Sequence, residues 1–277
     1  MTVRPSISDK RQTFFQMHQS GCFVIPNPWD AGSARFLQSL GFKALATTSS
    51  GFAWSQGCRD GGVSLETMLA HVRQMVAATD VPVNADFLNG FAHEPRGVAD
   101  NVRAAVQTGV AGLSIEDSTG DAAKPLYDLD AAAARMRAAR NAIDEAGGDV
   151  LLVGRAECFL VGRPDLEETL ARLKAYAQAG ADCLYAPGIR TRDHIRALVA
   201  AVAPKPVNLL VGSPSEFSVE QIAALGVRRI SVGGALARSA WGAFVGAARR
   251  IAEQGSFDAF QGAPSHDQID SFFRERG

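Results

Sequence analysis

Two carboxylates, Asp86 and Glu116, each end a short apolar segment that is typical of a β-strand. Neighbouring parallel strands lie about 5 Å apart, so these two side chains would share one mouth. Carboxylates held so close repel each other unless a cation lies between them, and their hard oxygens suit Mg²⁺, or Mn²⁺, better than zinc. The pair therefore predicts a metal site. The alternative is that each residue caps the helix that follows it.

Arg155 ends a strand that otherwise consists of Val, Leu and Gly. A guanidinium held there loses part of its hydration, which is costly without an anion. Its planar fork suits a carboxylate or an enolate oxygen, so the sequence predicts a substrate-binding and catalytic arginine. The alternative is a structural ion pair with Glu157 or Glu116.

Other polar residues stand near expected strand ends. Ser50 and Gly51 could offer a hydroxyl and backbone N–H groups to an anion, and a plain turn is the alternative. Asn208, inside the seventh expected strand, is predicted to contact the substrate. Three histidines fall on expected helices and are predicted to be surface residues: His18, His71 and His194.

Strand and helix patterns alternate along the chain. Charge-poor runs with little polar alternation are typical of parallel strands covered on both faces. Eight such runs are expected at Cys22–Ile25, Ala44–Thr48, Val81–Ala85, Gly112–Ile115, Val150–Gly154, Cys183–Tyr185, Val207–Val211 and Arg229–Val232. Helical patterns are expected between them at Leu65–Ala78, Pro95–Thr108, Leu129–Ala146, Leu166–Ala179 and Thr191–Val202. Glycines just past helices, as at Gly109 and Gly180, predict left-handed caps.

Eight strand–helix units predict a (β/α)₈ TIM-type barrel, whose chemistry lies at the carboxyl ends of the strands. An open doubly wound sheet is the alternative, but no G-x-G-x-x-G follows the first strand. The whole chain, 1–277, is expected to form one barrel domain, with an extra helix over 1–20 and a helical tail over 235–277. Gly255 and a Gly-Ala-Pro run break this tail and leave a last helix over 265–276.

The composition excludes several classes of protein. The 277 residues are 47% hydrophobic and 21% charged, which is a globular balance. Because 28 Lys and Arg face 29 Asp and Glu, no basic excess exists for nucleic acid. No run of about 18 apolar residues predicts a membrane span, and the N-terminus does not read as a signal peptide. The four cysteines form no CxxC pair and read as reduced thiols of a cytoplasmic protein.

Several motifs together resemble the isocitrate lyase/phosphoenolpyruvate mutase superfamily. The resemblance runs in order from about residue 20 to about residue 250 and is carried by motifs at successive strand ends. They are Asn27-Pro28-Trp29-Asp30-Ala31-Gly32-Ser33-Ala34-Arg35, Ser50-Gly51-Phe52, Gly57-Cys58-Arg59-Asp60, Asp86, Ile115-Glu116-Asp117 and Gly154-Arg155-Ala156-Glu157.

The resemblance implies a Mg²⁺-dependent barrel that makes or breaks C–C or P–C bonds beside a 2-oxo acid through an enolate. It places Asp86 and Glu116 in the metal shell, partly through water, and Asp60 near the metal and the reacting centre. It also implies that Ser50-Gly51-Phe52 binds the substrate carboxylate and that Arg155 binds the oxo or enolate oxygen. The family exchanges its last barrel helix between subunits, so a homo-oligomer is expected, either a dimer or a tetramer.

The departures from the family pattern limit the reaction. The lyases of the family carry a lid with a cysteine and a histidine after the fourth strand, whereas residues 118–127 here contain neither, nor the gate of the phosphonate enzymes. Efficient isocitrate cleavage and mutase activity are therefore not expected. Leu88 replaces the second carboxylate of the usual run after the third strand, which removes one negative group near the metal.

These observations predict a Mg²⁺-dependent enzyme that cleaves a C–C bond, or less readily a C–P bond, of a small 2-oxo acid or 2-hydroxy dicarboxylate. One alternative is a 2-oxo acid binding protein that kept the pocket without efficient catalysis. Another is a phosphate-binding barrel of a different class, which the glycines of Ser231-Val232-Gly233-Gly234-Ala235 favour.

Overall fold

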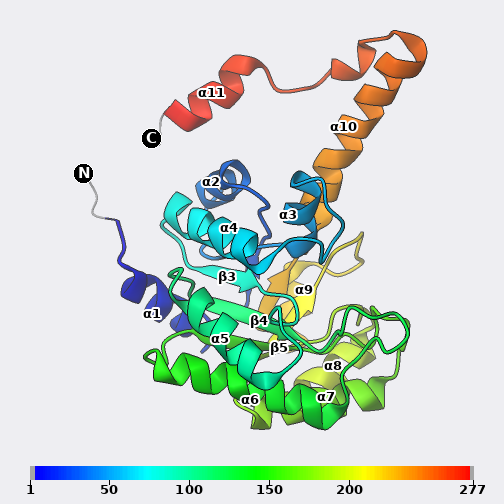
Figure 1. Cartoon of the computed structure of the whole chain (residues 1–277). Helices are drawn as coiled ribbons and strands as arrows, with labels where there is room; N and C mark the ends of the chain where they lie inside the picture. The colour runs from blue at the N-terminus through cyan, green and yellow to red at the C-terminus, as the bar shows by residue number, and fades with distance from the viewer. Residues whose placement is uncertain (1–3, 275–277) are drawn as a thin grey trace. The chain divides into compact units, whose positions relative to one another are not determined.

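Eight short parallel strands form the centre of the part of the chain that ends at Gly234 (Figure 1). The computed structural model describes residues 4–274. Along the chain the strands are β1 (Phe23–Ile25), β2 (Leu45–Ala46), β3 (Val83–Asp86), β4 (Gly112–Glu116), β5 (Leu151–Arg155), β6 (Cys183–Tyr185), β7 (Val207–Leu210) and β8 (Arg229–Ser231). All eight expected strands are confirmed, with each boundary within two residues.

The strands pair in the order β1-β8-β7-β6-β5-β4-β3-β2, and every pair is parallel. No ladder joins β1 to β2, but two hydrogen bonds connect the residues around them. The Ala46 backbone N–H donates to the Pro26 carbonyl at 3.0 Å, and Asn27 Nδ2 donates to the Thr47 carbonyl at 3.0 Å. The sheet is therefore a nearly closed barrel, and the (β/α)₈ prediction is confirmed.

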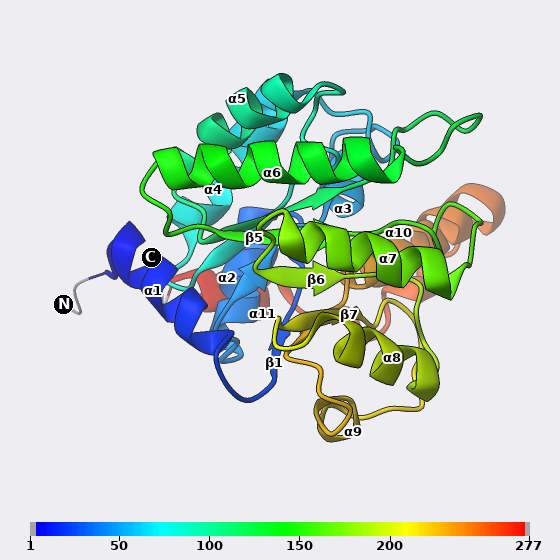
Figure 2. The ribbon, with the colours of Figure 1, turned by 90° about the horizontal axis from the view of Figure 1, so that it is seen from below.

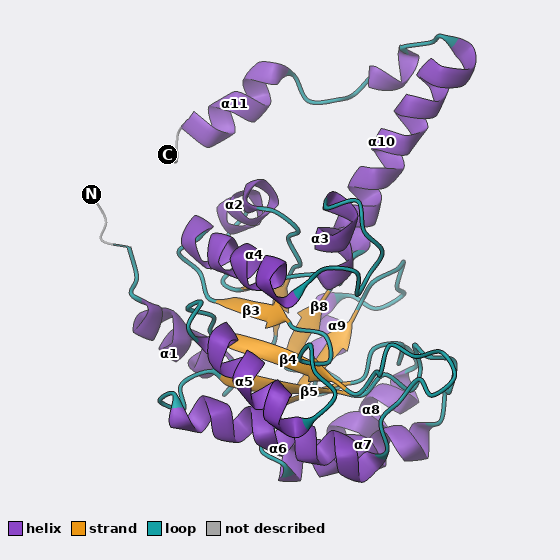
Figure 3. Ribbon diagram, viewed as in Figure 1, coloured by secondary structure: helices purple, strands orange, loops and turns teal. Residues whose placement is uncertain are grey.

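Helices surround the strands of this first unit (Figure 3). They are α1 (Ile7–Met17), α2 (Ala31–Ser39), α3 (Ser49–Ser55), α4 (Leu65–Ala78), α5 (Pro95–Val106), α6 (Leu129–Glu145), α7 (Leu166–Gln178), α8 (Arg192–Val202) and α9 (Val219–Ala223). The five expected helices between strands are confirmed within two residues, and α1 lies inside the N-terminal segment expected to be helical. The short helix α3 replaces the turn considered for its residues.

Local sequence explains where several helices begin and end. Ser6 and Asp9 form a capping box at α1, because each side chain accepts a hydrogen bond from the other residue's backbone N–H. Gly180 follows α7 with φ +104°, and a Cβ there would lie 2.5 Å from Cγ of Arg140. The left-handed cap predicted at this glycine is confirmed, and the crowding means that no larger residue fits without a shift.

Helix α1 covers the end of the barrel at which the strands begin. Phe14 of this helix is fully buried against Ile25, Ala46 and Leu151. Figure 2 shows α1 near the ends of the strands from which they start. Above this apolar layer the interior is polar, since residues such as Asn84 are buried on inward-facing strand positions. The expectation of parallel strands covered on both faces is confirmed, but several of the side chains that face the interior are polar.

The second unit begins at Ala235 and is helical throughout its described part. It holds α10 (Ala235–Gln254), the 3-10 turn η1 (Asp258–Phe260) and α11 (His266–Arg274). The predicted breaks are confirmed, while the last residues of the helix expected at 265–276 lie outside the described part. Large apolar side chains of this unit are exposed: Trp241, Phe244, Phe257, Phe260, Ile269 and Phe273. None of the helices within residues 4–274 has the length and apolarity to cross a bilayer.

Candidate active site

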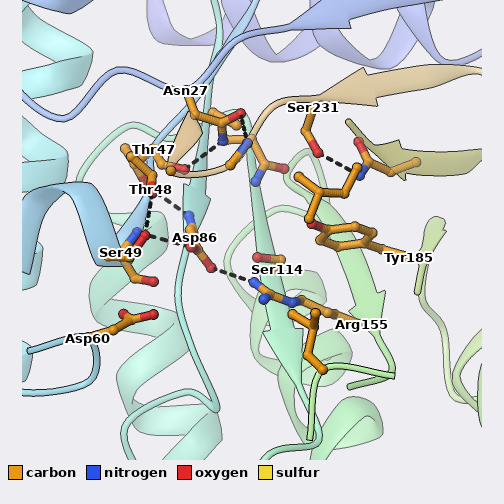
Figure 4. Close-up of a pocket in the computed structure, with 18 of the residues that line it drawn as sticks. Asn27, Thr47, Thr48, Ser49, Asp60, Asp86, Ser114, Arg155, Tyr185 and Ser231 are labelled. Atoms are coloured by element: carbon orange, nitrogen blue, oxygen red, sulfur yellow. Dashed lines mark hydrogen bonds and ion pairs between the residues drawn. The ribbon is translucent and has the colours of Figure 1, made fainter. Parts of the chain in front are cut away.

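A cavity of about 190 Å³ lies at the carboxyl ends of the strands. It is smaller than the roughly 300–1,000 Å³ of sites for drug-sized ligands, and it therefore suits a small acid. Figure 4 shows most of its lining residues. They are Asn27, Ala46, Thr47, Thr48, Ser49, Ser50, Asp60, Asn84, Asp86, Ser114, Arg155, Leu160, Tyr185, Asn208, Leu210, Arg229, Ser231, Gly233 and Gly234.

Arg155, the last residue of β5, lies among three carboxylates. Its Nη1 lies 3.2 Å from Oδ1 of Asp86 and 3.3 Å from Oε2 of Glu116, the last residues of β3 and β4. Its Nε donates to Oε1 of Glu157, and its guanidinium carbon lies 5.1 Å from the ring centroid of Tyr185. The three strand-end residues predicted from the sequence are thus in contact, and the ion pairs considered as an alternative for Arg155 are also present.

These charges perturb one another because they are buried together. Burial raises the pKa of Glu116 well above its usual range; Arg155 opposes this rise, and Glu157, Asp86 and Asp60 add to it. Burial alone would lower the pKa of Arg155, but Glu157 and Glu116 hold it well above its usual value. The arginine is therefore permanently charged, whereas the carboxylates compete for its charge.

Asp86 is held from two sides. Its Oδ2 accepts a hydrogen bond from the Ser49 backbone N–H at 3.0 Å, while Oδ1 faces Arg155. Its own N–H donates to Oγ1 of Thr47 at 2.8 Å, which ties the end of β3 to the segment after β2. The carboxylate is therefore fixed in orientation before any ligand arrives.

Asp60 reaches the cavity from the loop that follows α3. Figure 4 shows it beside Ser49, on the opposite side of the drawn residues from Tyr185. Burial raises its pKa, and the charge of Asp86 raises it further, against a hydrogen bond from Ser49. A carboxyl whose pKa is shifted toward neutrality is suited to transfer protons.

The donor set fits a divalent cation. Asp86, Glu116 and Glu157 contact the single guanidinium of Arg155, and a fourth carboxylate, Asp60, lines the same cavity. This leaves an excess of negative charge that a cation would balance. Among residues 4–274, no three His, Cys, Asp or Glu side chains are placed to coordinate one ion together. A cation held by Asp86 and Glu116 would therefore keep several waters, which is common for Mg²⁺.

The segment predicted to bind the substrate carboxylate is only partly at the cavity. Ser50 lines it, whereas Gly51 and Phe52 do not. The Gly51 N–H donates to Oγ1 of Thr48 at 3.3 Å, and the Phe52 ring stacks on His71 at 3.7 Å between centroids. Gly51 and Phe52 therefore lie behind the wall.

Two of the three histidines predicted at the surface are buried, so that prediction is wrong for His18 and His71. His71 lies on the face of α4 that packs against α3, and burial lowers its pKa to about 4. His18 packs edge-on against Phe14 and Phe23 beneath the barrel. Helical periodicity was not enough to assign either histidine to the outer face.

Asn208, which is predicted to contact the substrate, lines the cavity, but neighbouring side chains form hydrogen bonds with its amide. Its Nδ2 donates to Oγ of Ser231 at 2.9 Å, and its Oδ1 accepts from Nε of Arg229 at 2.8 Å. Apart from Asn208, the sequence reasoning missed this group of buried polar side chains. The available signal was the type of the inward-facing strand residues: Asn84, Ser114, Asn208, Arg229 and Ser231.

The glycine pair after β8 does not present a free anion nest. The backbone N–H groups of Val232 and Gly233 both donate to Oδ1 of Asn27, each at 2.9 Å. Because this amide oxygen already occupies both donors, the geometry removes the observation that favoured a phosphate-binding barrel.

The segment after β4 forms a short hairpin. Ser118 and Leu126 pair as an isolated antiparallel bridge, and the Thr119 N–H donates to the Pro125 carbonyl at 3.0 Å. Neither Cys58 nor Cys158 lines the cavity. None of the cysteines in the described part of the chain lines the cavity.

Comparison with known proteins gives consistent matches. A sequence profile of the family described as Phosphoenolpyruvate phosphomutase matches residues 14–252. An uncharacterized protein of Mycobacterium tuberculosis is 32% identical over 80% of this chain and 81% of its own. The oxaloacetate decarboxylase of Bradyrhizobium diazoefficiens is 30% identical over 72% of this chain and 69% of its own.

Three solved structures are similar over nearly the whole chain. A protein of Burkholderia cenocepacia described as a candidate lyase/mutase has a TM-score of 0.92 and 46% identity, covering 96% of both chains. A 2,3-dimethylmalate lyase has a TM-score of 0.83 and 27% identity over 100% of this chain and 95% of its own. An oxaloacetate acetylhydrolase in complex with oxalate has a TM-score of 0.83 and 26% identity over 96% of this chain and 94% of its own.

Proposed function

This chain belongs to the phosphoenolpyruvate mutase/isocitrate lyase superfamily, and we propose that it is a Mg²⁺-dependent carbon–carbon lyase acting on a small 2-oxo or 2-hydroxy dicarboxylate. The resemblance predicted from the motifs is confirmed at the level of the superfamily. Its similar proteins include an oxaloacetate decarboxylase, an oxaloacetate acetylhydrolase and a dimethylmalate lyase. These names support cleavage of a C–C bond.

One observation carries the proposal. The guanidinium of Arg155, which lines a cavity sized for a small acid, contacts both Asp86 on the same wall and Glu116 behind it. Asp86 and Glu116 would hold Mg²⁺, which supplies Lewis-acid polarisation of a 2-oxo group when bound. Arg155 keeps its positive charge beside the oxygen on which negative charge develops, and such a fixed charge favours the transition state.

The residues of the chain then divide the work. For oxaloacetate, the C3–C4 bond would break, CO₂ would leave, and the released electron pair would form the enolate of pyruvate. Arg155 would stabilise the enolate oxygen, and the hydroxyl of Ser50 would donate a hydrogen bond to the substrate carboxylate. For a 2-hydroxy acid, Asp60 would accept the hydroxyl proton as the C–C bond breaks. Solvent would protonate the enolate carbon, since no thiol acid lines the cavity.

The test compares turnover of oxaloacetate and isocitrate, each with Mg²⁺, for the wild type and for Arg155→Ala. Loss of one such oxyanion donor should lower kcat by about 10²–10³-fold. Arg163→Ala is the matched control, because Arg163 is an exposed arginine that pairs with Glu168. This control should retain full activity.

Rapid isocitrate cleavage, or equal rates in the wild type and Arg155→Ala, would contradict the proposal. If calorimetry detects oxo acid binding but no oxo acid is turned over, the chain is the binding protein considered as the alternative.

Assembly and compartment belong to the same proposal. We propose a cytoplasmic homo-oligomer, with a tetramer favoured, in which α10 and α11 are exchanged between subunits of a single-domain barrel. The exposed aromatic side chains of the second unit, such as Phe244 and Phe257, support it because they need a partner. Sedimentation at micromolar concentration should show a dimer or tetramer, and a monomer would overturn this part.

A further inference from the structure

Arg229, the first residue of β8, is a buried cation without an acidic partner. It is 2% exposed. Its Nε donates to Oδ1 of Asn208 at 2.8 Å, and its Nη1 donates to Oδ1 of Asn84 at 3.3 Å. No carboxylate of residues 4–274 forms an ion pair with it, although it lines the cavity. Its charge is held in place by neutral groups and is not neutralised by them.

Another buried arginine of the same unit shows the contrast. Arg172 forms ion pairs with Asp117 and with Glu168, at 3.1 and 2.7 Å. Arg172 does not line the cavity, whereas Arg229 does. Neutral groups also hold Arg135, which is buried outside the cavity and donates to the carbonyls of Asn89, Ala92 and His93. What distinguishes Arg229 is that its unpaired charge faces a cavity that a ligand can enter.

Neighbouring residues orient the two amides that contact Arg229. A Cβ at Gly112 would lie 2.8 Å from Oδ1 of Asn84, so the bare glycine makes room for the amide that contacts Arg229. On the other side, Ser231 accepts from Asn208 and so turns the oxygen of that amide toward Arg229. All these polar side chains are buried and line the same cavity.

Stability does not explain this arrangement. Barrel interiors are usually filled by branched aliphatic side chains, and an unpaired buried charge costs free energy. Burial lowers the pKa of Arg229, yet arginine remains protonated in proteins. A group of this kind becomes favourable when a ligand brings the missing negative charge into the cavity.

We propose that Arg229, with Asn84, Asn208 and Ser231, forms a deep subsite for a second carboxylate of the substrate. Arg229 opens its strand whereas Arg155 closes its own, so the subsite lies deeper in the barrel than the acidic mouth. This inference rests on the proposed function and deepens it. The substrate is a small diacid with one carboxylate at Ser50, its 2-oxo or 2-hydroxy group near Arg155 and its second carboxylate at Arg229.

The test compares two unreactive acids of nearly the same shape, succinate and butyrate, which differ by one carboxylate. Their affinities are measured by calorimetry without metal for the wild type, Arg229→Met and Arg229→Lys. We expect wild type to bind succinate about 10- to 100-fold tighter than butyrate, as expected for hydrogen bonds to a charged group. Arg229→Met should bring this ratio close to one, while Arg229→Lys should keep most of it.

Arg228→Met is the matched control, because the neighbouring Arg228 donates to the Gly21 carbonyl and does not line the cavity. It should leave the ratio unchanged. A ratio that survives in Arg229→Met overturns the proposal. The proposal is also overturned if Arg229→Met loses binding of chloride or phosphate but keeps binding of succinate, since the subsite would then hold an inorganic anion.

Asn84→Asp tests the same subsite without removing the arginine. It places a carboxylate where the amide oxygen now lies 3.3 Å from Nη1 of Arg229. An internal partner should raise the Tm and lower the affinity for succinate at the same time; an unchanged affinity contradicts the proposal. Because these measurements need no turnover, they can fail while oxaloacetate is cleaved, or succeed while it is not, so the two proposals are separable.

Discussion

The mouth and the deep end of one cavity treat an arginine in opposite ways. At the mouth, Arg155 contacts three carboxylates, and its single positive charge is outnumbered by these acidic groups. At the deep end, Arg229 contacts amide oxygens only. Arg229 is fully buried and Arg155 largely so, which means that both guanidinium groups are desolvated and differ in their partners. The excess of acids around Arg155 favours binding of a cation, whereas the unpaired positive charge of Arg229 favours binding of an anion.

Removing the mouth arginine should have the largest effect. Arg155→Gln leaves Asp86, Glu116 and Glu157 buried beside one another without their shared partner. Breaking a buried ion pair from one side typically costs about 3–5 kcal/mol, and we expect a loss of this size in the free energy of unfolding. Denaturant unfolding measures it. Arg163→Gln, at an exposed pair, should change stability by less than about 1 kcal/mol, and similar losses in both variants would contradict the comparison.

Metal removal should affect the mouth in a pH-dependent way. Burial and neighbouring acids raise the pKa of both Asp60 and Glu116 in the folded state. A carboxyl with a raised folded pKa favours folding most at pH below its unfolded value, and this contribution is lost as pH rises through the folded value. Without metal, these two groups should therefore make the protein less stable at about pH 8 than at about pH 5.

Mg²⁺ should have the opposite dependence, because its ligands must be deprotonated. We expect Mg²⁺ to raise the Tm more at about pH 8 than at about pH 5, and Asp86→Asn to abolish this gain while the protein stays folded. Thermal unfolding with Mg²⁺ or with a chelator measures both. An undiminished Mg²⁺ effect in Asp86→Asn would remove this residue from the metal site.

Replacing the deep arginine should cost less stability than replacing the one at the mouth. Arg229→Met leaves two amide oxygens without a donor, at about 1–3 kcal/mol for an unsatisfied buried group, but it also removes an unpaired charge. We therefore expect a net loss of about 1 kcal/mol in the same unfolding experiment, well below that of Arg155→Gln. Equal losses would show that Arg229 is as firmly partnered as Arg155.

A thiol substitution should have the smallest effect. Cys58→Ser should leave kcat for oxaloacetate unchanged, because the sulfur donates to the Gln56 carbonyl and lies off the cavity wall. Steady-state kinetics measures this. A large fall in kcat would place a thiol acid near the reacting carbon and would end the view that solvent protonates the enolate.

Sequence reasoning recovered the mouth more fully than the deep end, for a physical reason. Asp86, Glu116 and Arg155 are charged residues at strand ends, and a barrel gathers strand ends at one place. Asn84 and Arg229 stand inside or at the start of short strands, where they were read as part of an apolar element. Recognising them required the register, which sets them on inward-facing positions, and register depends on contacts between strands distant in sequence.

The same limit applies to the segment after β2. The motif containing Gly51 and Phe52 identified the correct region, but the fold turns it into a helix and leaves Ser50 at the cavity. The sequence predicts His71 at the surface because it does not reveal that Phe52 lies against its ring. Tertiary packing decided both outcomes, and local propensity carries no information about it.

Asn27 both lines the cavity and helps to close the barrel. Its amide bridges β8 to the end of β2 across the one junction that lacks a strand ladder, and the same side chain lines the cavity. A mutation of Asn27 that changes the shape of the cavity also removes hydrogen bonds that join the strands at the junction of β1 and β2. Evolution toward a new substrate should therefore avoid Asn27 and proceed through residues such as Leu160, which line the cavity without closing the fold.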